Sequence, residues 1–157
     1  MSAISRMLVN ALDVLLGQPG SAPPENSLLT PKIVLFVDGD PMSLALGAQI
    51  LAEHSYTTLQ AGTPSQAIKL FEDYCLVIDL VIVDVNMPEM SGFELAERVL
   101  QLNPRVPVLY TSGAFGEKTL KEGVFMIDKP FNSEELIRSV ARVLDPVLQH
   151  APDWAAF

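Results

Sequence analysis

Asp84 is the residue of this sequence that is best placed for chemistry. It follows the apolar run Leu80–Val83, which predicts a strand that is buried on both faces and ends at the aspartate. In open α/β sheets, ligands bind at the carboxyl ends of the strands. An aspartate at such a position can also cap the next helix, but Ser91 is better placed for that role, directly before Gly92 and the helical run Phe93–Leu102. We therefore predict that Asp84 is free for chemistry.

Two more carboxylates follow the first predicted strand, Lys32–Val37. Asp38 and Asp40 lie there on either side of Gly39. Carboxylates at neighbouring strand ends repel one another unless a cation lies among them, and hard oxygen ligands suit Mg²⁺. The alternative is a simple turn, in which the Asp-Gly and Asp-Pro pairs lead the chain out of the strand and cap a helix.

The segment Asp84-Val85-Asn86-Met87-Pro88, with Gly92 eight residues after the aspartate, resembles the phosphorylation loop of response-regulator receiver domains. The pair Lys129-Pro130, at the end of the last predicted strand, is the second strongest signature of that family in the chain. The resemblance covers about residues 32–148. It implies that Asp84 is the phosphoacceptor.

The same resemblance gives roles to residues at two other strand ends. It implies that Lys129 pairs with Asp84 and later with a phosphoryl oxygen, as a mobile point charge. It also implies a cis bond between Lys129 and Pro130, and a hydroxyl that donates to the phosphoryl group, assigned to Ser112 with Thr111 as the alternative. If the resemblance to that family is set aside, the Ser112-Gly113 pair is interpreted as a turn and Lys129 as a solvated surface lysine.

The predicted metal site departs from the family pattern. Receiver domains usually carry two adjacent acids after the first strand, and here Asp38 matches the first while Gly39 occupies the position of the second, direct ligand. The ligand set that remains is Asp38, Asp40, Asp84 and the backbone carbonyl of Asn86. Asp40 can turn towards the metal because Gly39 is permissive, or it can serve only as a helix cap. We therefore expect Mg²⁺ to bind more weakly than is usual in the family.

Two further departures concern signalling. Receivers often have an aromatic residue three positions before the lysine, where this chain has Met126, with Phe125 beside it. The segment from Ser112 to Lys129 is also short for a full fourth helix, because only about residues 117–122 can be helical. Tyr110–Phe115 is similar in chemical type to a motif of the receiver subfamily whose fourth helix is degenerate.

Strands and helices alternate along the chain, which predicts right-handed βαβ units and a doubly wound parallel sheet. The resemblance implies a flavodoxin-like sheet with the strand order 2-1-3-4-5. The predicted strands are Lys32–Val37, Tyr56–Gln60, Leu80–Asp84, Val106–Tyr110 and Val124–Ile127. The predicted helices are Pro41–Glu53, Pro64–Tyr74, Phe93–Leu102 and a last one that begins at Asn132 or Ser133 and ends near Leu144.

Residues 1–16 have apolar side chains at helical spacing and predict an extra amphipathic helix, which must bury its apolar stripe. It can dock on its own domain, pair with a second copy to form a homodimer, or lie on a partner. Residues 17–31 are rich in Pro and Gly and predict a linker. Residues 149–157, which include Trp154, are interpreted as a tail.

Composition excludes several classes of protein. The formal net charge of −9 argues against nucleic acid as a partner, because the sequence has no basic patch that could bind the phosphates of a nucleic acid. Cys75 is the only cysteine, so the chain forms no internal disulfide and fits the reducing cytoplasm. The apolar stretch near the N-terminus is interrupted by polar residues and is shorter than the roughly 20 residues that span a bilayer.

The resulting hypothesis is a stand-alone receiver without an enzymatic output domain. A histidine kinase or phosphotransfer protein passes a phosphoryl group to Asp84, and the chain then signals to an unknown downstream protein by direct binding. One alternative is a pseudo-receiver that binds proteins and never takes phosphate, which Gly39 and Met126 favour. Another is a flavodoxin-like binder of small molecules, which has little support because no Gly-rich phosphate loop follows the first strand.

Overall fold

The computed structural model describes residues 30–113 and 124–145. The chain divides into two units, residues 1–31 and 32–157, and the fold below is that of the second unit. The predictions for the helix over 1–16, for the linker up to residue 29, for residues 117–122 and for the tail lie outside the described residues.

Five strands alternate with four helices in the described part of the chain. The strands are β1 (Ile33–Val37), β2 (Thr57–Ala61), β3 (Leu80–Asp84), β4 (Val108–Ser112) and β5 (Phe125–Asp128). The helices are α2 (Pro41–Glu53), α3 (Pro64–Tyr74), α4 (Gly92–Leu102) and α5 (Ser133–Leu144).

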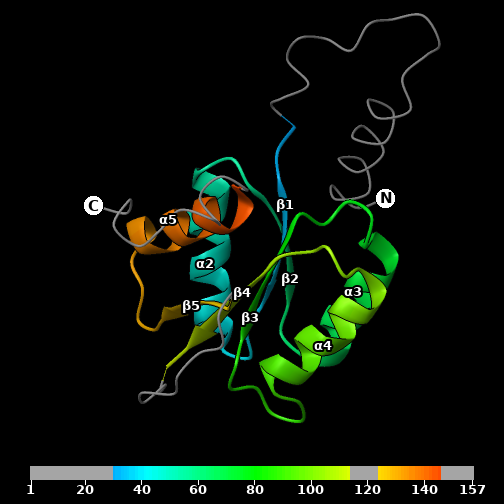
Figure 1. Ribbon diagram of the computed structural model, residues 1–157. Coiled ribbons are helices and arrows are strands. Elements are labelled where there is room, and N and C mark those ends of the chain that lie inside the picture. Colours follow the sequence, from blue (N-terminus) through cyan, green and yellow to red (C-terminus); the bar gives the residue numbers. More distant parts are fainter. Residues whose placement is uncertain (1–29, 114–123, 146–157) are drawn as a thin grey trace, which may run out of the picture. The chain divides into compact units, whose positions relative to one another are not determined.

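All five strands are parallel and lie in the order β2-β1-β3-β4-β5. Helices α2 and α5 cover one face of the sheet, and α3 and α4 cover the other (Figure 1). This arrangement confirms the predicted flavodoxin-like, doubly wound fold with the strand order 2-1-3-4-5.

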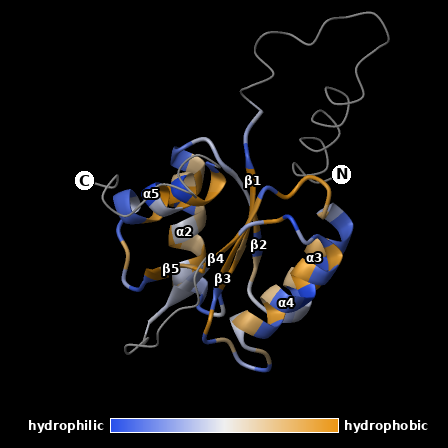
Figure 2. Cartoon of the chain, viewed as in Figure 1, coloured by the Kyte–Doolittle hydropathy of each residue, from blue (hydrophilic) through white to orange (hydrophobic). Residues whose placement is uncertain are grey.

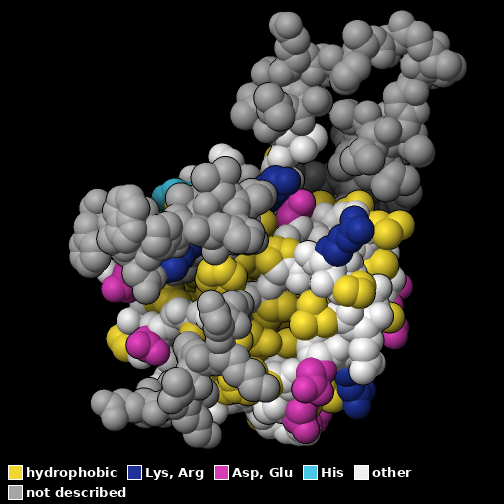
Figure 3. Space-filling view, in the orientation of Figure 1, with side chains coloured by type: hydrophobic (Ala, Val, Ile, Leu, Met, Phe, Trp, Pro, Cys, Tyr) yellow, Lys and Arg dark blue, Asp and Glu magenta, His cyan; other side chains and the backbone are white. Residues whose placement is uncertain are grey.

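The core lies on both faces of the central strands. Every residue of β1 and of β3 is buried, which is why the apolar runs show no alternation and appear as hydrophobic strands in Figure 2. On the face of α2 and α5, side chains from β1, β3, β4 and β5 pack against Leu136, Val140 and Val143 of α5. Hydrophobic side chains also gather between α5 and α4 on the face shown in Figure 3. A rigid apolar core of this kind holds the strand ends in fixed positions.

Four strands, β1, β2, β4 and β5, begin one or two residues later than predicted. The amide of Tyr56 donates to Leu51 O at the end of α2, so β2 starts only at Thr57. Strand β4 extends to Ser112 because Thr111 O and Ser112 O accept hydrogen bonds from neighbouring strand ends. These carbonyls belong to buried hydroxyl residues, and hydropathy alone does not mark such residues as strand.

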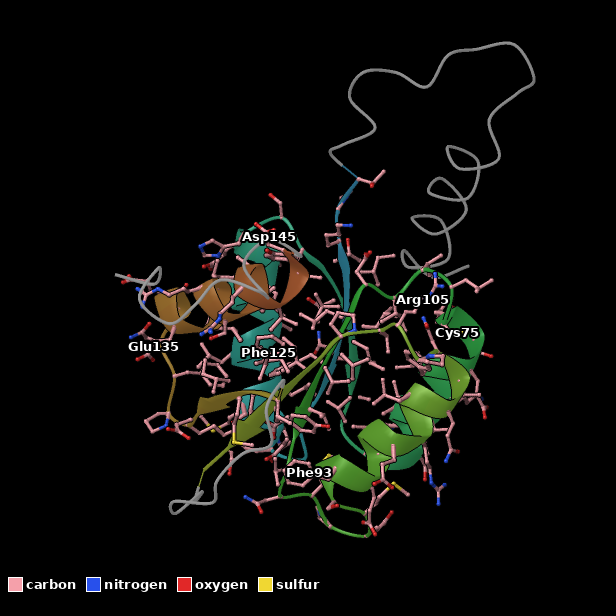
Figure 4. All side chains as sticks on the ribbon, in the orientation of Figure 1. Cys75, Phe93, Arg105, Phe125, Glu135 and Asp145 are labelled. Carbon is pink, nitrogen blue, oxygen red and sulfur yellow. The ribbon has the colours of Figure 1, made fainter. Side chains whose placement is uncertain are left out.

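The helix caps agree with the predictions. Ser91 caps α4 and forms a capping box with Glu94, and Asn132 does the same for α5 with Glu135, which Figure 4 labels. A cap of this kind contributes about 1 kcal/mol. Because Ser91 satisfies the first turn of α4, the carboxylate of Asp84 has no role in that helix.

Candidate functional site

The carboxylates of Asp38 and Asp84 lie side by side at the carboxyl ends of β1 and β3. The two strands pair in register up to Val37 and Val83, and each aspartate is the next residue. Asp38 is fully buried, whereas the Asp84 side chain is 10% exposed. Two adjacent carboxylates in an environment of this kind require a positive charge.

Lys129 supplies that charge from the end of β5. Its Nζ lies 2.5 Å from Asp38 Oδ2 and 3.3 Å from Asp84 Oδ2, and its side chain is 18% exposed. Its backbone N–H donates to Ser112 O at 2.8 Å, which ties the lysine to the end of β4, and its bond to Pro130 is cis. The ammonium group therefore reaches from β5 to β3 and β1.

Sequence reasoning predicted the pairing of Lys129 with Asp84 but missed the shorter contact with Asp38. A signal for it was present, since Asp38 follows the strand next to β3 and an ammonium group that reaches Asp84 is also close to it.

The other oxygens of the two carboxylates accept backbone hydrogen bonds. Asp38 Oδ1 accepts from the amide of Asp40 at 2.8 Å, and Asp84 Oδ1 accepts from the amide of Asn86 at 3.0 Å. Both oxygens of Asp38 are therefore held at short distances. Asp84 Oδ2 is held more loosely, by the lysine at 3.3 Å, and it belongs to the more accessible of the two carboxylates.

Asp40 caps α2. Its carboxylate accepts from the amide of Met42 at 3.4 Å and from the amide and hydroxyl of Ser43 at 3.1 and 2.9 Å. The hydrogen bond from the Ser43 hydroxyl, followed by the one from its amide, lowers the pKa of Asp40. Of the two roles predicted for Asp40, the structure shows the cap.

The hydroxyls of Thr111 and Ser112 are buried at the end of β4. Neither has a hydrogen-bond partner within the described part of the chain. Thr111 is in register with Asp84 of β3, and Ser112 is in register with Asp128 of β5. Because successive side chains of a strand point to opposite faces of the sheet, the two hydroxyls leave β4 in different directions. A buried hydroxyl without a partner costs about 1–3 kcal/mol, and both hydroxyls remain candidates to donate to a group bound at Asp84.

Comparison with known proteins places this arrangement in a family. Residues 34–141 match the family model of the response regulator receiver domain. The chain belongs to the response regulator receiver family.

Among its relatives, the two-component response regulator ARR11 of Arabidopsis thaliana is 34% identical over 124 residues, which are 76% of this chain and 24% of ARR11. The autoinducer 1 sensor kinase/phosphatase LuxN of Vibrio campbellii is 34% identical over 87 residues, 55% of this chain and 10% of LuxN. The chain thus spans a quarter or less of these two proteins. The solved chemotaxis protein CheY4 of Vibrio cholerae has a TM-score of 0.68 and 27% identity, over 73% of this chain and all of CheY4.

This receiver brings two of the predicted carboxylate ligands together but not the third. Asp38 and Asp84 are adjacent, but the carboxylate of Asp40 is turned into the cap of α2, and Asp38 is already bound on both oxygens. Residues 30–113 and 124–145 contain no group of three or more His, Cys, Asp or Glu side chains that could hold a metal ion. The donors that the structure describes therefore do not fit the four-ligand magnesium site, and metal binding stays a prediction.

Gly39 leaves space where the receiver pattern has its second acid. A Cβ at this position would lie 3.6 Å from Cδ of Pro88, an ordinary van der Waals contact. A side chain at 39 would therefore face the loop that follows Asp84. Position 39 therefore lacks the acidic ligand of the receiver pattern, although the space around it would accept a Cβ.

Met126 of β5, at the position where receivers often carry an aromatic residue, is in register with Tyr110 of β4. The Tyr110 ring packs against Phe93 at the start of α4, with 4.8 Å between ring centroids. Figure 4 labels Phe93 and Phe125.

None of the described helices is long and apolar enough to cross a membrane.

Proposed function

We propose that Asp84 accepts a phosphoryl group from a histidine kinase or phosphotransfer protein, and that the modified receiver signals by binding another protein. The observation that carries this proposal is the loosely held Oδ2 of Asp84, 3.3 Å from the ammonium group of Lys129 at a strand end. Receiver domains are signalling domains and generally not enzymes. In this proposal the chain is the cytoplasmic protein that receives the phosphoryl group from the donor.

The transfer is a substitution at phosphorus. Asp84 Oδ2 forms the new P–O bond while the P–N bond of the donor's phosphohistidine breaks, and the released imidazole nitrogen keeps the electron pair and takes a proton from solvent. Lys129 lies where it can follow the charge from the carboxylate to the phosphoryl oxygens. Ser112, or Thr111 in its place, donates its unpaired hydroxyl to the new group.

The output is a change in protein binding. Once a phosphoryl group occupies the site, the end of β4, which carries Thr111 and Ser112, closes on the new oxygens. The surface built from β4 and β5 has two conformations, and the phosphoryl group changes their relative populations. A downstream protein binds the conformation that the phosphoryl group favours. Pairing through residues 1–16 would add a homodimer, and deletion of that segment would then lower the mass measured by light scattering.

Receiver domains generally bind Mg²⁺. In this chain the acid at position 39 is missing and Asp40 is engaged as a cap, so we infer a magnesium affinity below the family's usual range.

The test compares the parent with Asp84→Asn and with a matched control, Asp128→Asn, which removes an exposed carboxylate at the end of β5. A phosphorylated histidine phosphotransfer domain or a small phosphodonor is the source of phosphate, and mass spectrometry measures its incorporation. We expect Asp84→Asn to reduce incorporation to background and Asp128→Asn to match the parent. Incorporation into Asp84→Asn equal to that of the parent would refute the proposal.

A second candidate is a pseudo-receiver, a binding module that never takes phosphate. The contact of Lys129 with both carboxylates favours it, because this network is already satisfied without a ligand. A folded parent that takes no phosphate from either kind of donor would support this candidate.

A further inference from the structure

We infer that Lys129 takes the place of a divalent metal in this receiver, so that Asp84 accepts a phosphoryl group at nearly the same rate with and without Mg²⁺. The inference rests on the proposed function and adds the identity of the cation that serves the site. It departs from the metal dependence that the family implies.

The first step concerns the acids that a metal would need. Asp38 has one oxygen 2.5 Å from Lys129 Nζ and the other 2.8 Å from the amide of Asp40. The carboxylate of Asp40 accepts from Met42 and Ser43. A metal ion would have to displace the lysine from Asp38 and break the cap of α2 to recruit both acids. Asp84 alone is left as a readily available carboxylate.

The second step is a count of charge at the strand ends. The two acids that contact Lys129, Asp38 and Asp84, carry −2 and the lysine carries +1, which leaves −1 among these three groups. Asp40 interacts with the same lysine, but its carboxylate is held in the cap of α2. A receiver with an acid at position 39 would add one negative charge to these groups, giving −3 against the same lysine and leaving −2, which one divalent cation would balance. Gly39 thus lowers the electrostatic demand for a metal and removes one of its ligands.

The third step is the placement of the ammonium group. Lys129 is held by its backbone at Ser112 O, and only 18% of its side chain is exposed, so its charge is screened less than that of a surface lysine. It contacts Asp84 at Oδ2, the oxygen that would attack phosphorus under the proposed function. A short movement transfers the ammonium contact from that oxygen to the phosphoryl oxygens, which is the charge stabilisation that a metal would otherwise supply.

The experiment uses acetyl phosphate as donor and the full-length chain. Asp84 Oδ2 then attacks phosphorus, the P–O bond of the donor breaks, and acetate leaves with the electron pair, so no other reactant is needed. The parent, Gly39→Asp and the uncharged control Gly39→Asn are compared in Mg²⁺ and in EDTA. A Cβ at position 39 would lie 3.6 Å from Pro88 Cδ, an ordinary contact, so the backbone has room for the first atom of either side chain.

Mass spectrometry follows incorporation, and a Mg²⁺ titration monitors the NMR signal of the Asn86 amide, which donates to Asp84. We expect incorporation into the parent and into Gly39→Asn to change less than about threefold on removal of Mg²⁺. Gly39→Asp should lose about tenfold or more in EDTA and bind Mg²⁺ about tenfold more tightly than the parent, a difference of about 1.4 kcal/mol.

The outcomes separate this inference from the proposed function. A parent that takes phosphate in Mg²⁺ and loses it in EDTA overturns the inference and leaves the proposed function in place. A parent that binds Mg²⁺ as tightly as Gly39→Asp does also overturns it, since Asp40 would then have left its cap. A folded parent that takes no phosphate in either buffer, or from a phosphorylated phosphotransfer protein, overturns both.

Discussion

The carboxyl ends of β1 and β3 are neighbours in the sheet, and each is followed by or ends on an aspartate, but the chain leaves them over different distances. Helix α2 begins at Pro41, three residues after Asp38, and Asp40 must cap it. Helix α4 begins at Gly92, eight residues after Asp84, and Ser91 caps it. The longer loop separates capping from chemistry.

The two aspartates differ accordingly. Asp38 is fully buried and bound on both oxygens, whereas Asp84 keeps one loosely held oxygen at a more accessible position. Under the proposed function, the end of β1 would support the site and the end of β3 would carry its reaction.

The largest effect is expected from a methyl group at Gly92, where the longer loop returns to the strand. A Cβ there would lie 2.3 Å from the carbonyl oxygen of Asp84, which belongs to the backbone and cannot move aside. We expect Gly92→Ala to lower the free energy of unfolding by about 3 kcal/mol. Gly39→Ala, at the end of β1, meets only Pro88 at 3.6 Å and should cost less than about 1 kcal/mol. Urea unfolding measures both, and equal costs would contradict the contrast.

The next effect concerns the cation that the two strand ends share. Lys129→Gln removes the partner of a buried carboxylate, and we expect a loss of about 2 kcal/mol in the free energy of unfolding. The control is Lys32→Gln, because Lys32 is 57% exposed and its ion pair with Asp79 lies at the other end of β1. That variant should change stability by less than about 0.5 kcal/mol. Similar losses for the two variants would show that the bridge between the carboxylates contributes little.

The smallest effect is expected at the cap of α2. Asp40→Ala should lower Tm by a few degrees at neutral pH, and Asp40→Asn by less, since asparagine also caps helices. The folded state lowers the pKa of Asp40 below 3.8, so the stability due to its charge is present above about pH 3.8 and is lost as the pH falls through the folded pKa. Thermal unfolding at pH 7 and pH 3 should show the parent and Asp40→Asn converging in acid. A difference that is the same at both pH values would mean that the charge of Asp40 has no part in the cap.

Much of the fold follows from the sequence because local signals agree with one another. Pro41 and Pro64 mark first turns, Ser91 and Asn132 mark caps, and the unbroken apolar run of β3 marks a central strand. Each signal acts over a few residues, which is why α2, α3 and β3 have the predicted bounds. The end of β4 was placed too early because Thr111 and Ser112 are polar residues in a buried strand.

The site was less predictable because it depends on side chains that meet across the sheet. Family resemblance pointed to Asp84, Ser112 and Lys129, but the closer partner of Lys129 is Asp38, which depends on how far the ammonium group reaches. The role of Asp40 was open between ligand and cap until the backbone around Ser43 was placed. Such choices are made by distances of about an ångström, which a linear pattern does not contain.

The most direct test of the contrast between the two strand ends is to locate the phosphoryl group. The full-length chain is treated with acetyl phosphate, the acyl phosphate is trapped by reduction, and tandem mass spectrometry of the peptides identifies the modified aspartate. Our account predicts modification at Asp84 and none at Asp38 or Asp40. Modification at either residue of the β1 end, or an unmodified Asp84 in a folded protein, would contradict it.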